Sequence, residues 1–375
     1  MTRFIIVIAG ITITIISLNF LSCPFIWIFF SWFFVLLVLA ITSHKHSVKL
    51  IFYYISLIPF TLGIFETYLF INTKIHSKYT EGVIIRKHNV LGYAPLAGSN
   101  ASHAKYFNND LIFDVEYKIN SDGLRISPPY NSRELLGSIL FFGGSFTYGT
   151  GLNDTETMPY QTGIKTHGKY YIYNFGFRGY GPHQMLAAIE HGMVEKTVKF
   201  RPKYAIYQAL IGHIGRAAGL AFWDTYGPKY LLNKDGKIVY DGHYNKWIIA
   251  GLRESFIFKK IMRKKLGRIN SSSKYVNLFI EIIDKSRKML ETRYPGCEFH
   301  VLLRGGKNQT NYIEILEKLK QRRIKIHPIN DIFNCSNISH KASELRISKH
   351  DTHPSPLANE IIARYLTEKI IKMEE

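Results

Sequence analysis

Cysteine and charge are both in short supply over parts of this 375-residue chain. The three cysteines, Cys23, Cys297 and Cys335, are too few to form a disulfide framework. Only four of the 48 basic and 28 acidic residues lie in 1–72, so the remaining 303 positions carry about 24% charged residues, an ordinary share for a globular domain. The chain contains no internal repeat, and its composition excludes collagen-like and disordered proteins. It therefore combines an almost uncharged amino-terminal part with a globular part large enough to bury a core.

The amino-terminal part is predicted to form transmembrane helices. As a single helix, the apolar stretch 4–42 would be roughly 58 Å long, nearly twice the hydrocarbon core of about 30 Å. A polar and helix-breaking interruption divides it into spans 4–20 and 25–42, and a third apolar run covers 50–71. The loop 43–49 is basic, which places it in the cytoplasm. Three spans then make this an integral membrane protein with its carboxyl-terminal domain on the extracytoplasmic side.

A cleaved signal over 1–22 is the alternative interpretation. Arg3 precedes an apolar run, and Leu21-Ser22-Cys23 faintly resembles a lipoprotein cleavage site. Pro24 and the second apolar run that follows it fit a signal peptide poorly.

Glu66 is the one acidic residue of the third predicted span. A charged group at membrane depth is a functional candidate by default. Glu66 lies about a turn and a half from the outer end of its span, so we expect its carboxylate to snorkel to the membrane interface.

The globular part changes character along its length. Residues 82–126 contain short alternating apolar runs broken by turn residues, which predicts a small β-rich segment. From Ser138 onward, apolar runs of strand length alternate with helix-period stretches, which favours a parallel sheet covered on both faces. We therefore expect a membrane anchor over 1–72, a β-rich lead-in over 73–133 and an α/β domain over 134–375. In such sheets, functional residues collect at the carboxyl ends of the strands.

A serine stands directly after the first predicted strand of the α/β domain. The run 143–149, GGSFTYG, follows the apolar strand 139–142, and its glycines allow a sharp turn from which the hydroxyl of Ser145 projects. A helix that starts here aims free N–H groups at an incoming oxyanion. The run has no P-loop lysine and no Gly-x-Gly-x-x-Gly pattern, so it does not match a phosphate-binding loop. The pattern suits a nucleophile.

Two further runs are predicted to meet at the same sheet edge. The run 174–181, NFGFRGYG, follows a predicted strand. The run 350–355, HDTHPS, precedes a closing helix whose N-cap is Ser355 and whose first residue is Pro356. A serine, a histidine that takes its proton and an acid that orients the imidazole are the parts of nucleophilic acyl transfer.

In order and content these runs resemble the SGNH/GDSL hydrolase family, over about 138–371. Membership would imply a flavodoxin-like three-layer α/β/α fold with no cofactor and no metal. The resemblance implies that Ser145 is the nucleophile and that its own N–H is an oxyanion donor. It also implies that Gly179 is the second donor and that His353 is the general base.

Two departures concern the oxyanion site. Gly144 stands where the family usually has an aspartate that braces the loop. The third run, 210–216, LIGHIGR, lacks the asparagine that is the third donor, and Gly212 or His213 holds its place. Loss of one donor costs about 10² to 10³ in rate. We expect His213 to replace the asparagine as donor; the alternative is a structural histidine.

The third departure is the spacing before His353. The family's aspartate lies three positions before the histidine, where this chain has His350, whereas Asp351 lies two before. We expect Asp351 to be the orienting acid. His350, Asp351 and His353 also resemble metal ligands in type, but no other cluster completes a coordination shell and the serine run would go unexplained.

These residues predict a membrane-anchored serine esterase that forms an acyl-enzyme on Ser145, with an acylated small molecule, lipid or glycan as substrate. Two alternatives stay open: O-acyl transfer to a glycan or lipid hydroxyl, and a catalytically weakened protein that binds an acylated ligand. The globular part carries 45 basic against 27 acidic residues. Outside the cytoplasm this excess favours membrane lipid or acidic glycans as partners, and no nucleic acid is expected.

Overall fold

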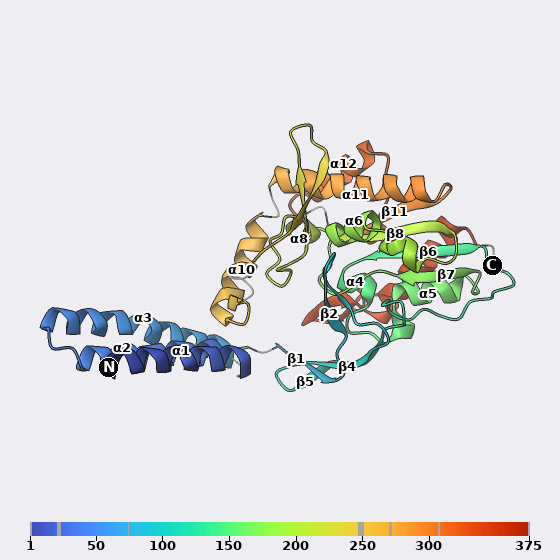
Figure 1. Ribbon diagram of the computed structural model, residues 1–375. Coiled ribbons are helices and arrows are strands. Elements are labelled where there is room, and N and C mark those ends of the chain that lie inside the picture. Colours follow the sequence, from blue (N-terminus) through green and yellow to red (C-terminus); the bar gives the residue numbers. More distant parts are fainter. Residues whose placement is uncertain are drawn as a thin grey trace. The chain divides into compact units, whose positions relative to one another are not determined.

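The computed structural model describes residues 2–20, 24–73, 75–246, 251–269, 272–306 and 308–373, which Figure 1 traces in order of sequence. The chain divides into two compact units. The first comprises Met1–Lys74 and Lys246–Lys265, and the second comprises Ile75–Asn245 and Leu266–Glu375. The predicted lead-in therefore falls, apart from its first two residues, in the same unit as the predicted α/β domain. Cys23 and the other residues of the possible cleavage site lie outside the described residues.

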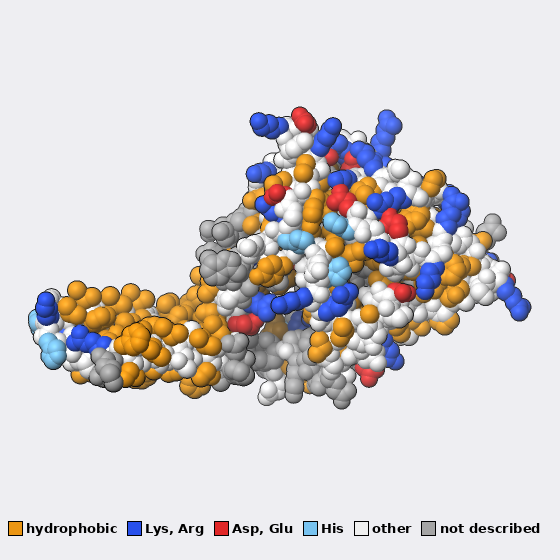
Figure 2. Space-filling view, in the orientation of Figure 1, with side chains coloured by type: hydrophobic (Ala, Val, Ile, Leu, Met, Phe, Trp, Pro, Cys, Tyr) orange, Lys and Arg blue, Asp and Glu red, His pale blue; other side chains and the backbone are white. Residues whose placement is uncertain are grey.

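The first unit begins with three helices, α1 (Thr2–Phe20), α2 (Pro24–Ile41) and α3 (His46–Ile71). By length and composition, α2 and α3 are able to cross a membrane, whereas the apolar stretch described in α1, Arg3–Leu18, is shorter. On the face drawn in Figure 2, hydrophobic side chains make up most of the described surface of these helices. Two of the three predicted spans are therefore long and apolar enough to cross a membrane, and the first span stays a prediction.

Small and polar residues contribute to the packing of the three helices. The indole Nε1 of Trp32 in α2 donates a hydrogen bond to Thr14 Oγ1 in α1, at 3.0 Å. Gly63 of α3 lies against the ring of Phe30, which a Cβ at that position would approach to 3.2 Å. Such close approach at small residues is the usual way in which helices associate in lipid.

Glu66 bonds to a second segment of the first unit. Its side chain is buried, and it accepts hydrogen bonds from the backbone N–H groups of Phe256 (2.6 Å) and Ile257 (2.9 Å). These residues begin α10 (Phe256–Ile269), and they belong to the same compact unit as Glu66. The first N–H groups of a helix have no partner within the helix, and a carboxylate there is favoured by the helix dipole. The sequence analysis missed this partner, which lies 190 residues further along the chain, and the position of Glu66 at the membrane interface stays a prediction.

The second unit begins with the predicted β-rich segment. Three strands form an antiparallel sheet in the order β1-β4-β5, and two form a separate hairpin. Their bounds are Ile75–Glu81 (β1), Asn100–Phe107 (β4) and Asp110–Lys118 (β5) for the sheet, and Ile85–His88 (β2) and Gly92–Pro95 (β3) for the hairpin.

A five-stranded parallel sheet forms the centre of this unit, with the order β12-β11-β8-β6-β7. Its strands are β6 (Gly137–Gly143), β7 (Tyr170–Asn174), β8 (Pro202–Leu210), β11 (Glu298–Arg304) and β12 (Lys325–Pro328). Counted along the chain, the order is 5-4-3-1-2, which is the flavodoxin-like doubly wound order. The point where the winding reverses lies between β6 and β8, where ligand sites of such sheets form.

Helices cover both faces of the sheet (Figure 1). Ile139 and Phe141 of β6 belong to one hydrophobic core, and the alternate residues Leu140 and Phe142 belong to the other. The first core includes residues of α5 (Met158–Lys165), α13 (Ile329–Asn334) and α14 (Pro356–Tyr365). The second includes residues of α6 (Pro182–Glu190), α11 (Ser273–Arg293) and α12 (Tyr312–Gln321). The predicted three-layer α/β/α fold is confirmed.

Shorter elements complete the second unit. They are α4 (Ser145–Tyr148), a 3₁₀ turn (Asp154–Glu156), α7 (Met193–Thr197), α8 (His213–Ala217), the β9–β10 hairpin (Pro228–Leu232 and Ile238–His243), β13 (Arg346–Ser348), β14 (Asp351–Pro354) and a π-helical end (Leu366–Ile371). The side chain of Ser355 accepts a hydrogen bond from the backbone N–H of Ala358, which confirms its predicted role as N-cap of α14.

Arg125 fastens the lead-in to the loop that follows Ser145. Its guanidinium is buried and donates to Asp154 Oδ1 at 2.7 Å. It also donates to the backbone carbonyls of Tyr148, Gly149 and Leu152, each at 2.6 Å. A buried charge with a full set of partners is tolerated, whereas removal of one partner leaves the others unpaired.

We therefore expect Arg125→Met to lower the free energy of unfolding by about 3–5 kcal/mol, because Asp154 and three carbonyls lose their donor. Urea denaturation of the full chain in detergent, followed by near-ultraviolet circular dichroism, measures this loss. The exposed Arg133→Met is the matched control and should change stability by no more than about 0.5 kcal/mol. Similar losses of unfolding free energy in the two variants would contradict this role of Arg125.

Candidate active site

The turn after β6 presents one side chain to solvent. Gly143 has φ +156°, and a Cβ there would lie 2.2 Å from Thr147 Oγ1, so only glycine fits. Ser145 follows as the first residue of the short helix α4, with Gly144 at the N-cap. Residues 141–150 are buried except Ser145, which is half-buried. The backbone therefore holds the Ser145 hydroxyl at the carboxyl end of the first sheet strand.

His353 and Asp351, both in β14, lie beside this hydroxyl. His353 Nε2 is 2.9 Å from Ser145 Oγ, the separation of about 3 Å expected for a nucleophile and its base. His353 Nδ1 is 2.6 Å from Asp351 Oδ1, which also accepts the backbone N–H of His353 at 2.9 Å. Because an ionised carboxylate only accepts hydrogen bonds, Nδ1 donates and Nε2 is left to accept the serine proton. The arrangement is suited to activating a hydroxyl for attack on a carbonyl carbon.

His350 makes a different contact. Its ring stacks on Phe107 of β4, with ring centroids 3.4 Å apart and planes 5° from parallel. Asp351, not His350, bonds to the imidazole of His353. This placement supports the assignment of Asp351 as the orienting acid despite the unusual spacing.

Lys105 is a site residue that the sequence analysis missed. Its Nζ donates to Asp351 Oδ2 at 2.6 Å, so the two carboxylate oxygens of the buried Asp351 face Lys105 and His353 respectively. Burial alone would raise the pKa of Asp351, but the hydrogen bonds from His353 and Lys105 outweigh burial and hold this pKa well below its usual range. Lys105 lies on β4, 246 residues before its partner, and its local sequence indicates only a strand.

Gly179 lies in a tightly held turn. Its φ is +80°, and a Cβ there would lie 2.6 Å from both Tyr93 Oη and Trp223 Nε1. The Tyr93 hydroxyl donates to the carbonyl of Arg178 at 2.9 Å, and Trp223 Nε1 donates to the carbonyl of Gly179 at 3.3 Å. Only glycine fits this position. The role of its N–H as an oxyanion donor stays a prediction.

His213 is fully buried at the start of α8, with Nδ1 2.7 Å from the Tyr207 hydroxyl. Burial lowers the pKa of His213 well below its usual range, so the ring is neutral at pH 7. If the Tyr207 hydroxyl donates to Nδ1, the other nitrogen, Nε2, carries the hydrogen. Among the described residues, Nε2 has no hydrogen-bond partner. To replace the missing asparagine as oxyanion donor, His213 must be neutral and must have a free N–H beside the Ser145 turn. The burial of His213 and the unpartnered Nε2 are consistent with that role.

The space beside Gly144 links two of the departures from the family pattern. A Cβ at Gly144 would lie 2.7 Å from Arg216 Nη1, 3.0 Å from the carbonyl oxygen of Tyr180 and 3.1 Å from His213 Nε2. An aspartate at 144 would therefore need the room that His213 and Arg216 occupy. Glycine at 144 and histidine at 213 are compatible with each other.

Other side chains brace the turn in place of that aspartate. Asn174 Nδ2 donates to the backbone carbonyl of Thr147 at 3.2 Å, and Asn174 Oδ1 accepts the N–H of Gly176 at 3.0 Å. The Thr147 hydroxyl donates to Gln208 Oε1 at 2.9 Å. The ends of β6, β7 and β8 are thereby tied together through α4.

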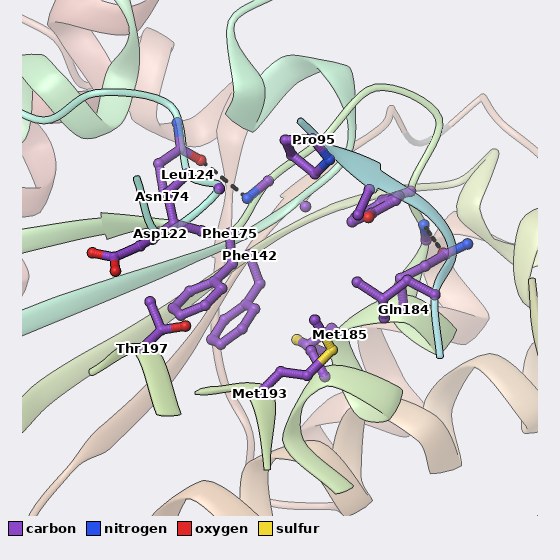
Figure 3. A pocket seen from close by; sticks show the side chains of 18 of the residues that line it. Pro95, Asp122, Leu124, Phe142, Asn174, Phe175, Gln184, Met185, Met193 and Thr197 are labelled. Carbon is purple, nitrogen blue, oxygen red and sulfur yellow. Dashed lines mark hydrogen bonds between the residues drawn. The ribbon is translucent and has the colours of Figure 1, made fainter. Parts of the chain in front are cut away.

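A mostly apolar cavity adjoins the turn (Figure 3). Side chains of the central sheet and α6, such as Phe142 and Met185, line it together with Pro95 and Leu124 of the lead-in segment. Gly143 also lines it, whereas Ser145, Asp351 and His353 are not among the lining residues.

Over the described ranges, no group of three or more His, Cys, Asp or Glu side chains is arranged to hold a metal ion. Lys105 and His353 bond to the Asp351 carboxylate, and His350 stacks on Phe107. These contacts account for the residue types that resembled metal ligands.

No protein-family model and no curated protein matches this sequence. Among solved structures, the chain is similar to a lipolytic protein of the G-D-S-L family from Desulfitobacterium hafniense, with 11% identity and a TM-score of 0.33 over 62% of this chain and 98% of that one. It is also similar to an acetyl xylan esterase from the rumen bacterium Butyrivibrio proteoclasticus, with 12% identity and a TM-score of 0.34 over 69% of each chain. A carbohydrate esterase matches with 13% identity and a TM-score of 0.35 over 72% of each chain. These likenesses are distant, so function is inferred from the site geometry.

We expect Asp351→Asn to slow labelling of Ser145 by a fluorophosphonate about 10³- to 10⁴-fold, because an amide at this position favours the wrong tautomer of His353. His350→Ala is the matched control and should slow labelling only a few-fold. Stopped-time labelling of the full chain in detergent, with peptide mapping of Ser145, gives both rates. The reverse ranking would assign the orienting role to His350.

Lys105→Met should move the acid limb of the labelling-rate profile to higher pH, by about one pH unit. Without the lysine, the Asp351 carboxylate loses one of the hydrogen bonds that hold its pKa low, so Asp351 takes up a proton, and no longer orients His353, at a higher pH. Lys105→Arg keeps the charge and should keep the profile near that of the wild type. A uniform loss of rate at every pH, with no shift, would mean that Lys105 only supports the fold.

Proposed function

We propose that this chain is a membrane-anchored serine esterase of the SGNH/GDSL type, with Ser145 as nucleophile, His353 as general base and Asp351 as orienting acid. The observation that carries the proposal is the continuous hydrogen-bond chain from Ser145 Oγ through His353 to Asp351, with heavy-atom separations of 2.9 and 2.6 Å. The motif order and the doubly wound sheet are those that the family resemblance implies.

In the proposed reaction, Ser145 Oγ attacks the carbonyl carbon of an ester while His353 Nε2 takes the hydroxyl proton. The tetrahedral oxyanion is stabilised by N–H groups of Ser145 and Gly179 and by the neutral ring of His213. The C–O bond to the alcohol then breaks, and the alcohol leaves with the proton held by His353. Water repeats the sequence on the acyl-enzyme, releases the carboxylic acid and restores Ser145.

The geometry favours catalysis over simple binding of an acylated ligand. A binding protein has no need of a base in contact with the serine, nor of an ionised acid buried behind that base. Acyl transfer to a glycan or lipid hydroxyl shares the acyl-enzyme step and differs only in the acceptor. The two long apolar helices support the anchoring, and the basic 43–49 loop supports an extracytoplasmic site. The proposed substrates are acylated small molecules, lipids or glycans.

A panel of acyl esters, from acetyl to long-chain, tests this function with the full chain in detergent. The full chain is needed because Glu66 is the hydrogen-bond partner of 255–257. We expect release of alcohol and of free acid. The Ser145→Ala variant should turn over these esters about 10⁴-fold more slowly, or slower still.

The Ser145→Ala control must keep the circular dichroism and thermal transition of the wild type. Alcohol release without free acid, in the presence of a sugar or glycerol acceptor, would indicate transfer in place of hydrolysis. Turnover that survives Ser145→Ala, or binding of esters without turnover by the wild type, would refute the proposal.

A further inference from the structure

The end of α3 holds the start of α10 by several independent contacts within the first unit. The buried carboxylate of Glu66 accepts the N–H groups of Phe256 and Ile257 and the hydroxyl of Ser255, the last at 3.1 Å. The ring of Phe256 packs edge-on against Phe70, with centroids 5.6 Å apart. The position of the α10 amino terminus relative to α3 is therefore well defined.

A fifth contact places a positive charge close to this junction. Lys260 Nζ lies 5.7 Å from the ring centroid of Phe65. With 26 residues, α3 is about 39 Å long, which exceeds a hydrocarbon core of about 30 Å. Glu66 lies only about 7.5 Å before the end of α3 at Ile71. If α3 spans a bilayer, the start of α10 lies where the lipid headgroups begin.

The sequence of α10 suits that level. Its 14 residues, FIFKKIMRKKLGRI, include six lysines and arginines and no acidic residue, and apolar side chains are interspersed among them. Ile261 is 58% exposed. Basic helices with apolar side chains of this kind lie in the membrane interface and are attracted to anionic lipids.

We propose that α10 is a membrane-surface helix that binds the anionic headgroups of the leaflet in which α3 ends. The proposal rests on the proposed membrane anchoring, and it goes beyond the ester chemistry of Ser145. Lipid is favoured over other polyanions because Glu66, Phe65 and Phe70 attach this basic helix to the end of a candidate membrane span. In this arrangement Lys259 and Lys260 meet phosphate groups, and Ile261 meets the upper acyl region.

Hydrogen exchange of the α10 amides in nanodiscs tests the proposal. The full chain is reconstituted in phosphatidylcholine alone and in a mixture of phosphatidylcholine and phosphatidylglycerol. We expect exchange over 256–269 to be slower in the mixture, on the order of tenfold or more. The triple variant Lys259→Gln, Lys260→Gln, Lys264→Gln should lose this difference.

The matched control removes three exposed lysines elsewhere, by Lys234→Gln, Lys237→Gln and Lys320→Gln, and should keep the full difference. Glu66→Gln should speed exchange at 256 and 257 in both lipids, because the carboxylate no longer holds these N–H groups as strongly.

Three outcomes would overturn the proposal. One is equal exchange of α10 in the two lipids when the chain is inserted in both. Another is a difference in α10 exchange between the two lipids that persists in the α10 triple variant or disappears in the control variant. The third is equal protection in phosphatidylcholine alone on addition of an acidic polysaccharide, which would identify glycan as the occupant. Failure of the chain to insert into either nanodisc would instead refute the anchoring, and ester turnover is measured separately from all of these.

Discussion

A buried, ionised carboxylate is the constraint on which the site depends. Asp351 has almost no contact with solvent, and a carboxylate in that position is stable only when its oxygens are paired. His353 pairs with one oxygen and Lys105 with the other. The same pairing sets the orientation of the His353 imidazole and its distance to Ser145. The need to pair the buried Asp351 charge therefore determines how the side chains around it are arranged.

The lead-in segment is consequently part of the site and not a spacer in front of it. Lys105 of β4 contacts the acid, Arg125 clamps the loop that follows Ser145, and Tyr93 of β3 holds the turn at Gly179. Each of these contacts joins a residue of 75–133 to the three-layer domain. The turn after β6 supplies Ser145, and β14 supplies Asp351 and His353. The lead-in fixes the backbone and charge around these side chains of the proposed triad.

Two departures from the family pattern, glycine at 144 and histidine at 213, are sterically linked. A side chain at 144 would collide with Arg216 and approach His213 Nε2, so glycine at 144 leaves room for a histidine at 213. Burial keeps that histidine neutral, and Tyr207 contacts its other nitrogen. Asn174 and Gln208 hold Thr147, which braces the turn without an aspartate at 144.

The sequence by itself determined the features that have a local or periodic signal. The alternation of strands and helices predicted the three-layer fold, and glycines around Ser145, with the closing run at His353, identified the residues that the structure brings together. Tertiary structure alone decided the roles of Lys105 and Glu66. Their partners lie 246 and 190 residues away, and no periodicity connects such positions. Packing likewise distinguishes His350 from Asp351. The His350 ring stacks on Phe107, whereas the Asp351 carboxylate bonds to His353, and no local pattern indicates this difference.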